Sequence, residues 1–110
     1  MPYNELLAER IRRALAGYEG VTEKKMFGGV TFMSLGRMLC GVVRDDLMVR
    51  VGPDRYEEAL SLPGVRPMDF THRPMKGMVF VSPSACAGDD ALQWWVALGL
   101  EFVNSLPTKE

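Results

Sequence analysis

The sequence has few of the side chains that usually build metal and catalytic sites. It holds one histidine, His72, and two cysteines, Cys40 and Cys86, which lie far apart in the chain. Structural zinc sites need closely grouped Cys and His ligands, commonly arranged as CxxC pairs, and the sequence contains no such pair. We therefore expect no metal site, and no motif indicates a cofactor.

Long hydrophobic segments are also missing. No apolar run approaches the roughly 20 residues that a membrane-spanning helix needs. The first residues, MPYNELLAERIRR, lack the basic-then-apolar order of a signal peptide. These two absences predict a cytoplasmic protein with free thiols and no membrane contact.

An excess of positive charge is missing as well. The 13 Lys and Arg residues are balanced by 14 Asp and Glu residues, for a net charge of -1. Dedicated duplex-binding domains usually carry a basic excess, because neutralising phosphates supplies much of their affinity. Direct nucleic-acid binding is therefore not expected. One alternative stays open, a local basic face made of Arg12, Arg13, Lys24, Lys25, Arg73 and Lys76.

What the sequence does contain is a succession of helix and strand patterns that fits one domain, 1–110. Leu7, Ile11 and Leu15 recur at helical spacing, and Asn4 stands before them as an N-cap. Strand-like segments follow at 21–26, 30–35, 37–43 and 47–51. Their short connections predict an antiparallel meander.

The second half of the chain returns to helix. We expect a short helix from Pro53 to about Leu62, an irregular stretch at 63–77 that holds three prolines, and a strand at 78–81. Asp89 or Asp90 is expected to cap the last helix. One face of that helix carries Leu92, Trp95, Val96, Gly99, Phe102, Val103 and Leu106. The predicted fold is α+β, a single antiparallel sheet of about five strands flanked by N- and C-terminal helices and one short internal helix.

Two segments carry a family resemblance. The first is Lys24 to Gly29, KKMFGG, and the second is Arg73 to Val81, RPMKGMVFV; the stretch VRVGP at 49–53 also fits. In this order the segments resemble the N-terminal domain of the TfoX/Sxy family over residues 6–106. We expect a stand-alone domain, without the C-terminal domain of longer members.

The resemblance implies a regulatory setting. The longer family members are associated with activating competence genes alongside the cyclic-AMP receptor protein. The family supplies no catalytic residues, so the resemblance implies a module that is not an enzyme.

The candidate partner-binding surface consists of exposed cations and a histidine: Lys24, Lys25, His72, Arg73 and Lys76. Gly28 and Gly29 lead into a strand rather than a helix, so they indicate a turn rather than a phosphate-binding loop. An enzyme would need His72 to act as base for Cys40 or Cys86, and no spacing supports that pairing.

Trp94 and Trp95 are adjacent in the last helix and so point about 100° apart. Trp95 lies on the apolar face and is expected in the core. Trp94 lines up with Leu98 in a second patch, which either packs within the chain or mediates self-association as a homodimer.

The leading interpretation is a non-enzymatic regulatory or protein-binding module with an unidentified protein partner. The alternatives are a nucleic-acid-associated protein that uses the basic face, and a small enzyme with a site around His72.

Overall fold

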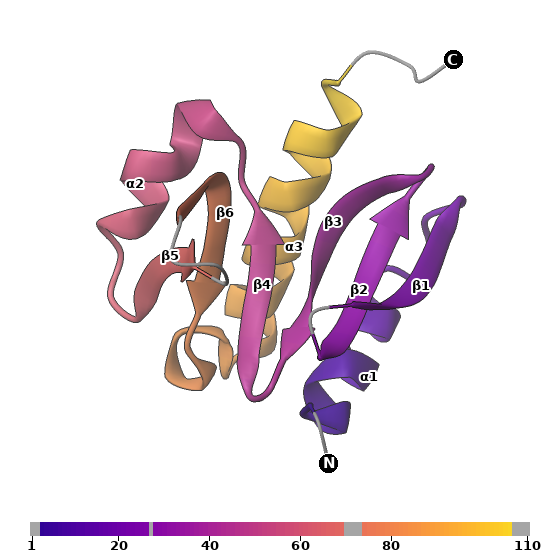
Figure 1. Cartoon of the computed structure of the whole chain (residues 1–110). Coiled ribbons are helices and arrows are strands. Elements are labelled where there is room, and N and C mark those ends of the chain that lie inside the picture. Colours follow the sequence, from indigo (N-terminus) through magenta and orange to yellow (C-terminus); the bar gives the residue numbers. More distant parts are fainter. Residues whose placement is uncertain (1–2, 27, 70–73, 107–110) are drawn as a thin grey trace.

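The computed structural model describes residues 3–26, 28–69 and 74–106, which form a six-stranded antiparallel sheet with three α-helices (Figure 1). The helices are α1 (Glu5–Ala14), α2 (Tyr56–Leu60) and α3 (Asp89–Asn104). The strands are β1 (Val21–Met26), β2 (Gly29–Ser34), β3 (Arg37–Val43), β4 (Asp46–Arg50), β5 (Val65–Asp69) and β6 (Pro74–Val81). The predicted α+β class is confirmed.

The strand order is β1-β2-β3-β4-β6-β5, so the first four strands form the predicted meander. The sequence predicts an irregular stretch at 63–77, and this prediction is wrong. It contains all of β5 and the first part of β6, which raises the number of strands from about five to six in the described chain. The sequence did not predict β5 because it contains Pro67, and proline usually argues against a strand unless the strand lies at an edge of the sheet.

Tight turns connect the meander. Leu35 (φ 52°) and Gly36 (φ 82°) join β2 to β3, and Arg44 (φ 55°) follows β3. Gly28 has φ 75° between β1 and β2, as the predicted turn requires. Two-residue hairpin turns need positive φ because their twist then matches that of the strands.

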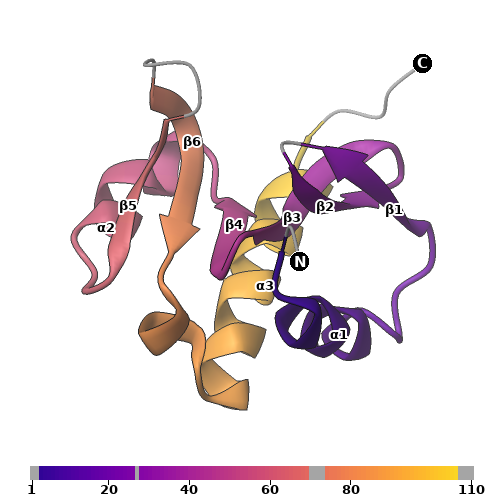
Figure 2. The same cartoon turned by 60° about the horizontal axis from the view of Figure 1, so that its bottom comes forward.

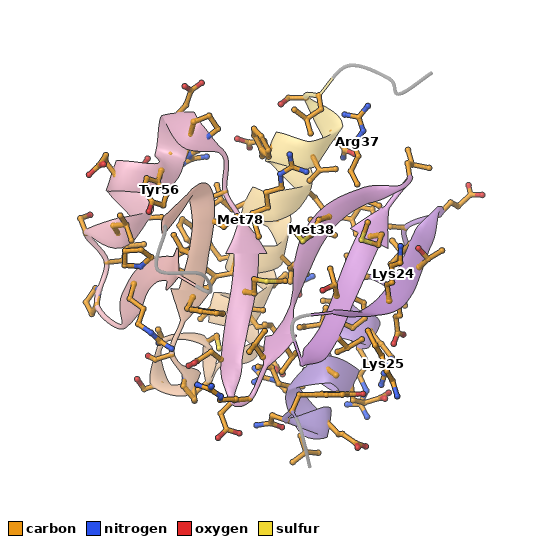
Figure 3. All side chains as sticks on the ribbon, viewed as in Figure 1. Lys24, Lys25, Arg37, Met38, Tyr56 and Met78 are labelled. Carbon is orange, nitrogen blue, oxygen red and sulfur yellow. The ribbon has the colours of Figure 1, made fainter. Side chains whose placement is uncertain are left out.

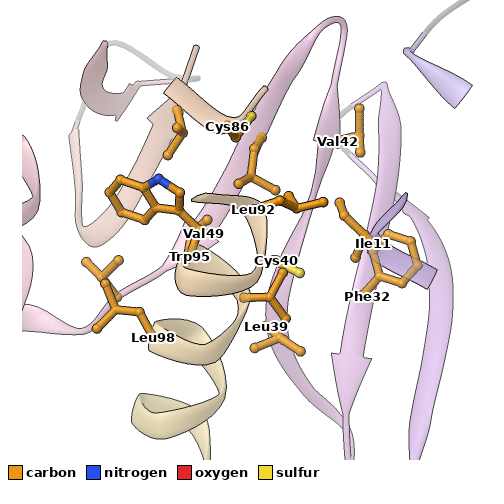
Figure 4. Packing of buried hydrophobic residues seen from close by; sticks show 14 of the residues in the cluster. Ile11, Phe32, Leu39, Cys40, Val42, Val49, Cys86, Leu92, Trp95 and Leu98 are labelled. Atoms are coloured by element: carbon orange, nitrogen blue, oxygen red, sulfur yellow. The ribbon is translucent and has the colours of Figure 1, made fainter. Parts of the chain in front are cut away.

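The main core lies between the sheet and the helices (Figure 4). Alternate residues of the strands, such as Phe32, Val42 and Val49, face Ile11 of α1 and Leu92 of α3. Gly99 brings α3 close to β3. A Cβ added there would lie 3.0 Å from Leu39 Cδ1 and 3.3 Å from the Leu39 carbonyl oxygen, so the predicted close contact is confirmed.

The other face of the sheet holds a smaller apolar cluster. Figure 2 shows that the sheet is strongly curved, with β5–β6 and β1–β2 rising on either side of β4. Val43, Met48, Met78 and Phe80 are buried in this trough, and Met38 packs against them. Opposite faces of the same strands therefore contribute to two separate clusters.

The two long helices begin differently. The Asn4 side chain caps α1 by accepting a hydrogen bond from the Leu7 N–H at 3.0 Å, as predicted. The N-cap of α3 is Gly88, so the predicted cap at Asp89 or Asp90 is wrong. Both aspartates lie in the first turn, where their charge is favourable to the helix dipole. None of the described helices is long and apolar enough to cross a bilayer.

Candidate partner-binding surfaces

Lys24 and Lys25 lie on β1, an edge strand of the sheet (Figure 3). Both side chains are exposed, and neither has an ion-pair partner among the described residues. Successive strand residues point to opposite faces. Lys25 shares the helix-covered face with its neighbour Val30, which belongs to the main core, whereas Lys24 and its neighbour Thr31 are on the other face.

Arg12 is held by two carboxylates and so contributes little to a basic face. Its Nε and Nη2 donate to Glu23 at 2.7 and 2.9 Å, and its Nη1 donates to Glu9 at 3.2 Å. The hydrogen bond from Arg12 lowers the pKa of Glu23, despite partial desolvation. Since Lys24 and Lys25 also point to opposite faces, these three cations do not present one continuous surface.

His72 and Arg73 lie outside the described residues. Lys76 belongs to β6, but its side chain is likewise outside the described part of the structure. The predicted surface that combines these residues with Lys24 and Lys25 therefore stays a prediction, as does the enzyme alternative around His72.

Both thiols are buried. Cys40 is 0% exposed, and desolvation raises its pKa to about 12. Burial also raises the pKa of Cys86, whose Sγ donates to the Ser82 carbonyl oxygen at 3.4 Å. Reactive cysteines need a lowered pKa and access to solvent, so neither thiol is arranged as a nucleophile. Across the described segments, no group of three His, Cys, Asp or Glu side chains could hold a metal ion.

Trp94 stands beside an apolar groove that sequence spacing could not reveal. The side chain is 46% exposed, and its ring meets that of Trp95 edge-on at 4.9 Å between centroids. The groove measures about 460 Å³ and is lined by Leu62, Pro63, Ala85, Ala91, Trp94 and Trp95. Residues 62–63 and residues of the stretch 85–95 build it together, so no local motif marks its walls.

Leu98 does not belong to this surface. It is only 7% exposed and packs in the main core (Figure 4), which agrees for this residue with the alternative of packing within the chain. Trp95 is buried as predicted. The self-association hypothesis now depends on Trp94 alone.

A second hollow, of about 580 Å³, lies where the end of α1 approaches β1. Its lining combines apolar and charged side chains: Arg12, Leu15, Ala16, Tyr18, Val21, Thr22, Glu23 and Phe32. Tyr18 is half exposed at this hollow. No local sequence pattern predicts this hollow, because it depends on how α1 is placed against the sheet.

Comparison with protein families matches residues 13–103 to the TfoX N-terminal domain. The chain belongs to this family. No curated protein and no solved structure matches it. The matched part of this TfoX N-terminal domain includes all of β1 and every residue that lines the Trp94 groove.

Proposed function

We propose that this TfoX N-terminal domain is a non-enzymatic module that binds a protein partner in a regulatory pathway, such as control of competence or transcription. The observation that carries the proposal is the half-exposed Trp94 beside its apolar groove. Tryptophans next to apolar pockets are frequent energetic centres of protein interfaces. The buried thiols with raised pKa values give further support to a role without catalysis.

The groove suits one large apolar side chain of a partner. All six lining residues are apolar or proline, so the fit comes from shape and desolvation rather than from charge. Trp94 would cover such a side chain while its own exposed surface becomes buried. Family membership supports the regulatory setting, and the groove supports the means of contact.

The test begins with a photo-crosslinking amino acid placed at position 94 in the native cell. The cross-linked partner is identified, and its affinity for the purified domain is then measured. Trp94→Ala should weaken binding by about 2 kcal/mol, roughly thirty-fold in Kd. Gln93→Ala is the matched control, since Gln93 is exposed on the same helix outside the groove, and it should leave Kd unchanged.

A cross-link to a second copy of this chain would identify the partner as the chain itself, in a homodimer built around Trp94. The proposal fails if no protein is cross-linked and the chain sediments as a monomer at about 100 µM. It also fails if Trp94→Ala binds the identified partner as tightly as the wild type. Denaturation of each variant checks that the fold is retained.

A further inference from the structure

We propose that β1 accepts an extended acidic segment of a partner protein as an additional antiparallel strand. The inference rests on the proposed protein-binding function, but it concerns a different surface from the Trp94 groove. Strand addition uses an open sheet edge for affinity and space for alternate side chains for specificity, and complementary charge adds to the selection of a partner. β1 combines all three.

The open edge has a defined set of backbone groups. The Leu35 N–H donates to the Gly20 carbonyl oxygen at 2.9 Å, and the antiparallel register then runs from Val21 opposite Ser34 to Met26 opposite Gly29. Inward and outward groups alternate along such a ladder. The N–H and C=O groups of Val21, Glu23 and Lys25 therefore point away from β2, and no described backbone hydrogen bond uses them.

The opposite edge of the sheet is closed to the same interaction. The Ser82 N–H donates to the Gly64 carbonyl oxygen at 2.8 Å, so the outward positions of β5 include Val65 and Pro67. The Val65 N–H is already bonded to the Leu62 carbonyl oxygen, and Pro67 has no N–H. A strand added at β5 would find no outward donor at either position. Proline is a usual means of protecting an edge.

The hollow between α1 and β1 provides space for the side chains of an added strand. Val21 and Glu23 line it together with Leu15 and Phe32, so it lies on the helix-covered face beside the open edge. Cross-strand neighbours share a face. A partner residue opposite Val21 would therefore point towards the hollow, where Tyr18 is exposed and able to cover an apolar side chain.

Charge selects an acidic partner. Glu23 is neutralised by Arg12, which leaves the two lysines to set the local charge of β1. A second copy of β1 would not supply this negative charge. The antiparallel register that pairs Glu23 with Lys25 places Lys24 opposite Lys24. Like charges directly opposite destabilise a strand pair.

The register predicts a pattern for the partner. In an antiparallel strand, the residues opposite Lys25 and Lys24 come in succession, and the residue opposite Val21 follows three positions later. The first two should carry carboxylates and the last should be apolar. The partner segment is thus acid, acid, any, any, apolar.

The probe is an acetylated and amidated peptide, Thr-Glu-Glu-Thr-Thr-Leu-Thr, added to the whole chain. Amide hydrogen exchange of Val21, Glu23 and Lys25 should slow on binding, because these N–H groups gain partners. The exchange of Thr22 and Lys24 should change little, since their N–H groups already bond to β2. Absence of saturable binding at about 1 mM peptide would overturn the proposal.

Methylated peptides separate strand addition from simple charge attraction. Methylation of the backbone nitrogen of the first central threonine, which faces Glu23, should weaken binding about tenfold or more. Methylation of the second central threonine should have little effect, because its N–H points away from β1. Equal effects of the two methyl groups would contradict strand addition. Equal binding of a peptide with lysines in place of both glutamates would contradict the acidic partner.

Variants of the protein complete the test. Glu23→Pro removes an outward N–H and should abolish binding, whereas Glu23→Thr keeps that N–H and should retain it. Lys24→Ala and Lys25→Ala should each weaken binding about two- to fivefold. Trp94→Ala should bind the peptide normally, so a failure of the Trp94 interface can be told apart from a failure at β1. If the chain dimerises and Glu23→Pro abolishes the dimer, the partner at β1 is a second copy of the chain. That result would overturn the proposal of an acidic partner segment.

Discussion

Burial controls the chemistry of the two thiols. Cys40 has no exposed surface and a pKa of about 12, and the pKa of Cys86 is raised as well. Only the thiolate reacts quickly with alkylating reagents. We predict that iodoacetamide at pH 8 modifies neither thiol of the native protein. In denaturant, both thiols should react within the same incubation time. Mass spectrometry gives the count, and rapid labelling of native Cys40 would contradict its burial.

Gly41 lies where β3 approaches β2 closely. A Cβ at this position would lie 3.1 Å from Thr31 Cα and would overlap the Val30 carbonyl oxygen, which belongs to the backbone and cannot turn aside. Gly41→Ala should therefore lower the free energy of unfolding by about 2–3 kcal/mol, as overpacked cores do. Gly17→Ala is the control, since a Cβ there meets nothing within 4 Å. Urea denaturation measures both, and equal midpoints would contradict the prediction.

Leu98 shows why single residues of α3 were hard to place from sequence. Its spacing from Trp94 left open whether the pair packs within the chain or mediates self-association. In the structure α3 packs against β3 and β4 and also contacts α1. A helix with neighbours on several sides buries a wider arc than one apolar stripe. Leu98 therefore falls inside the core while Trp94, one turn earlier, stays half exposed.

At the scale of elements, local sequence patterns predicted α1 and the β1–β4 meander well. In these elements, the sequence pattern agrees with the way the element packs in the structure. Asn4 caps α1, and short turns connect the strands. β5 could not be predicted, because its segment contains a proline and has no strand pattern of its own. It forms a strand by pairing with β6. The two hollows also depend on tertiary placement, which no local pattern encodes.

The ion pair of Arg12 with Glu23 links α1 to β1 and makes stability depend on pH. The folded pKa of Glu23 is lowered, so the pair stabilises the fold above the unfolded pKa of about 4.3 and this contribution is lost as pH falls through the folded pKa. Because the Glu23 side chain is 39% exposed, solvent limits the effect to about 0.5 kcal/mol.

We therefore predict that Glu23→Gln lowers the free energy of unfolding by about 0.5 kcal/mol at pH 7. The difference from the wild type should vanish near pH 2, where the glutamate of the wild type is also neutral. Urea titrations at several pH values measure this difference. Glu19→Gln is the control, because Glu19 has no ion pair in the described structure. A difference that stays constant with pH would contradict the pairing.

At the scale of the whole molecule, near-neutral charge argues against autonomous DNA binding. The net charge is -1, and Arg12 is already paired. We predict no retardation of duplex DNA in gel shifts at about 50 mM salt. The double variant Glu9→Gln, Glu23→Gln releases Arg12 and shows whether ion pairs suppress binding. Salt-dependent binding by the wild type would instead support the basic-face alternative.

The order of elements along the chain has a consequence for synthesis. α3 follows the last strand and supplies seven buried residues to the core: Leu92, Trp95, Val96, Leu98, Gly99, Leu100 and Val103. A ribosome that adds about 5–20 residues each second completes the sheet seconds before it completes this helix. During that interval α3 does not yet cover the apolar face of the nascent sheet. Chaperones that bind exposed apolar surfaces would therefore bind this chain before it can complete its fold.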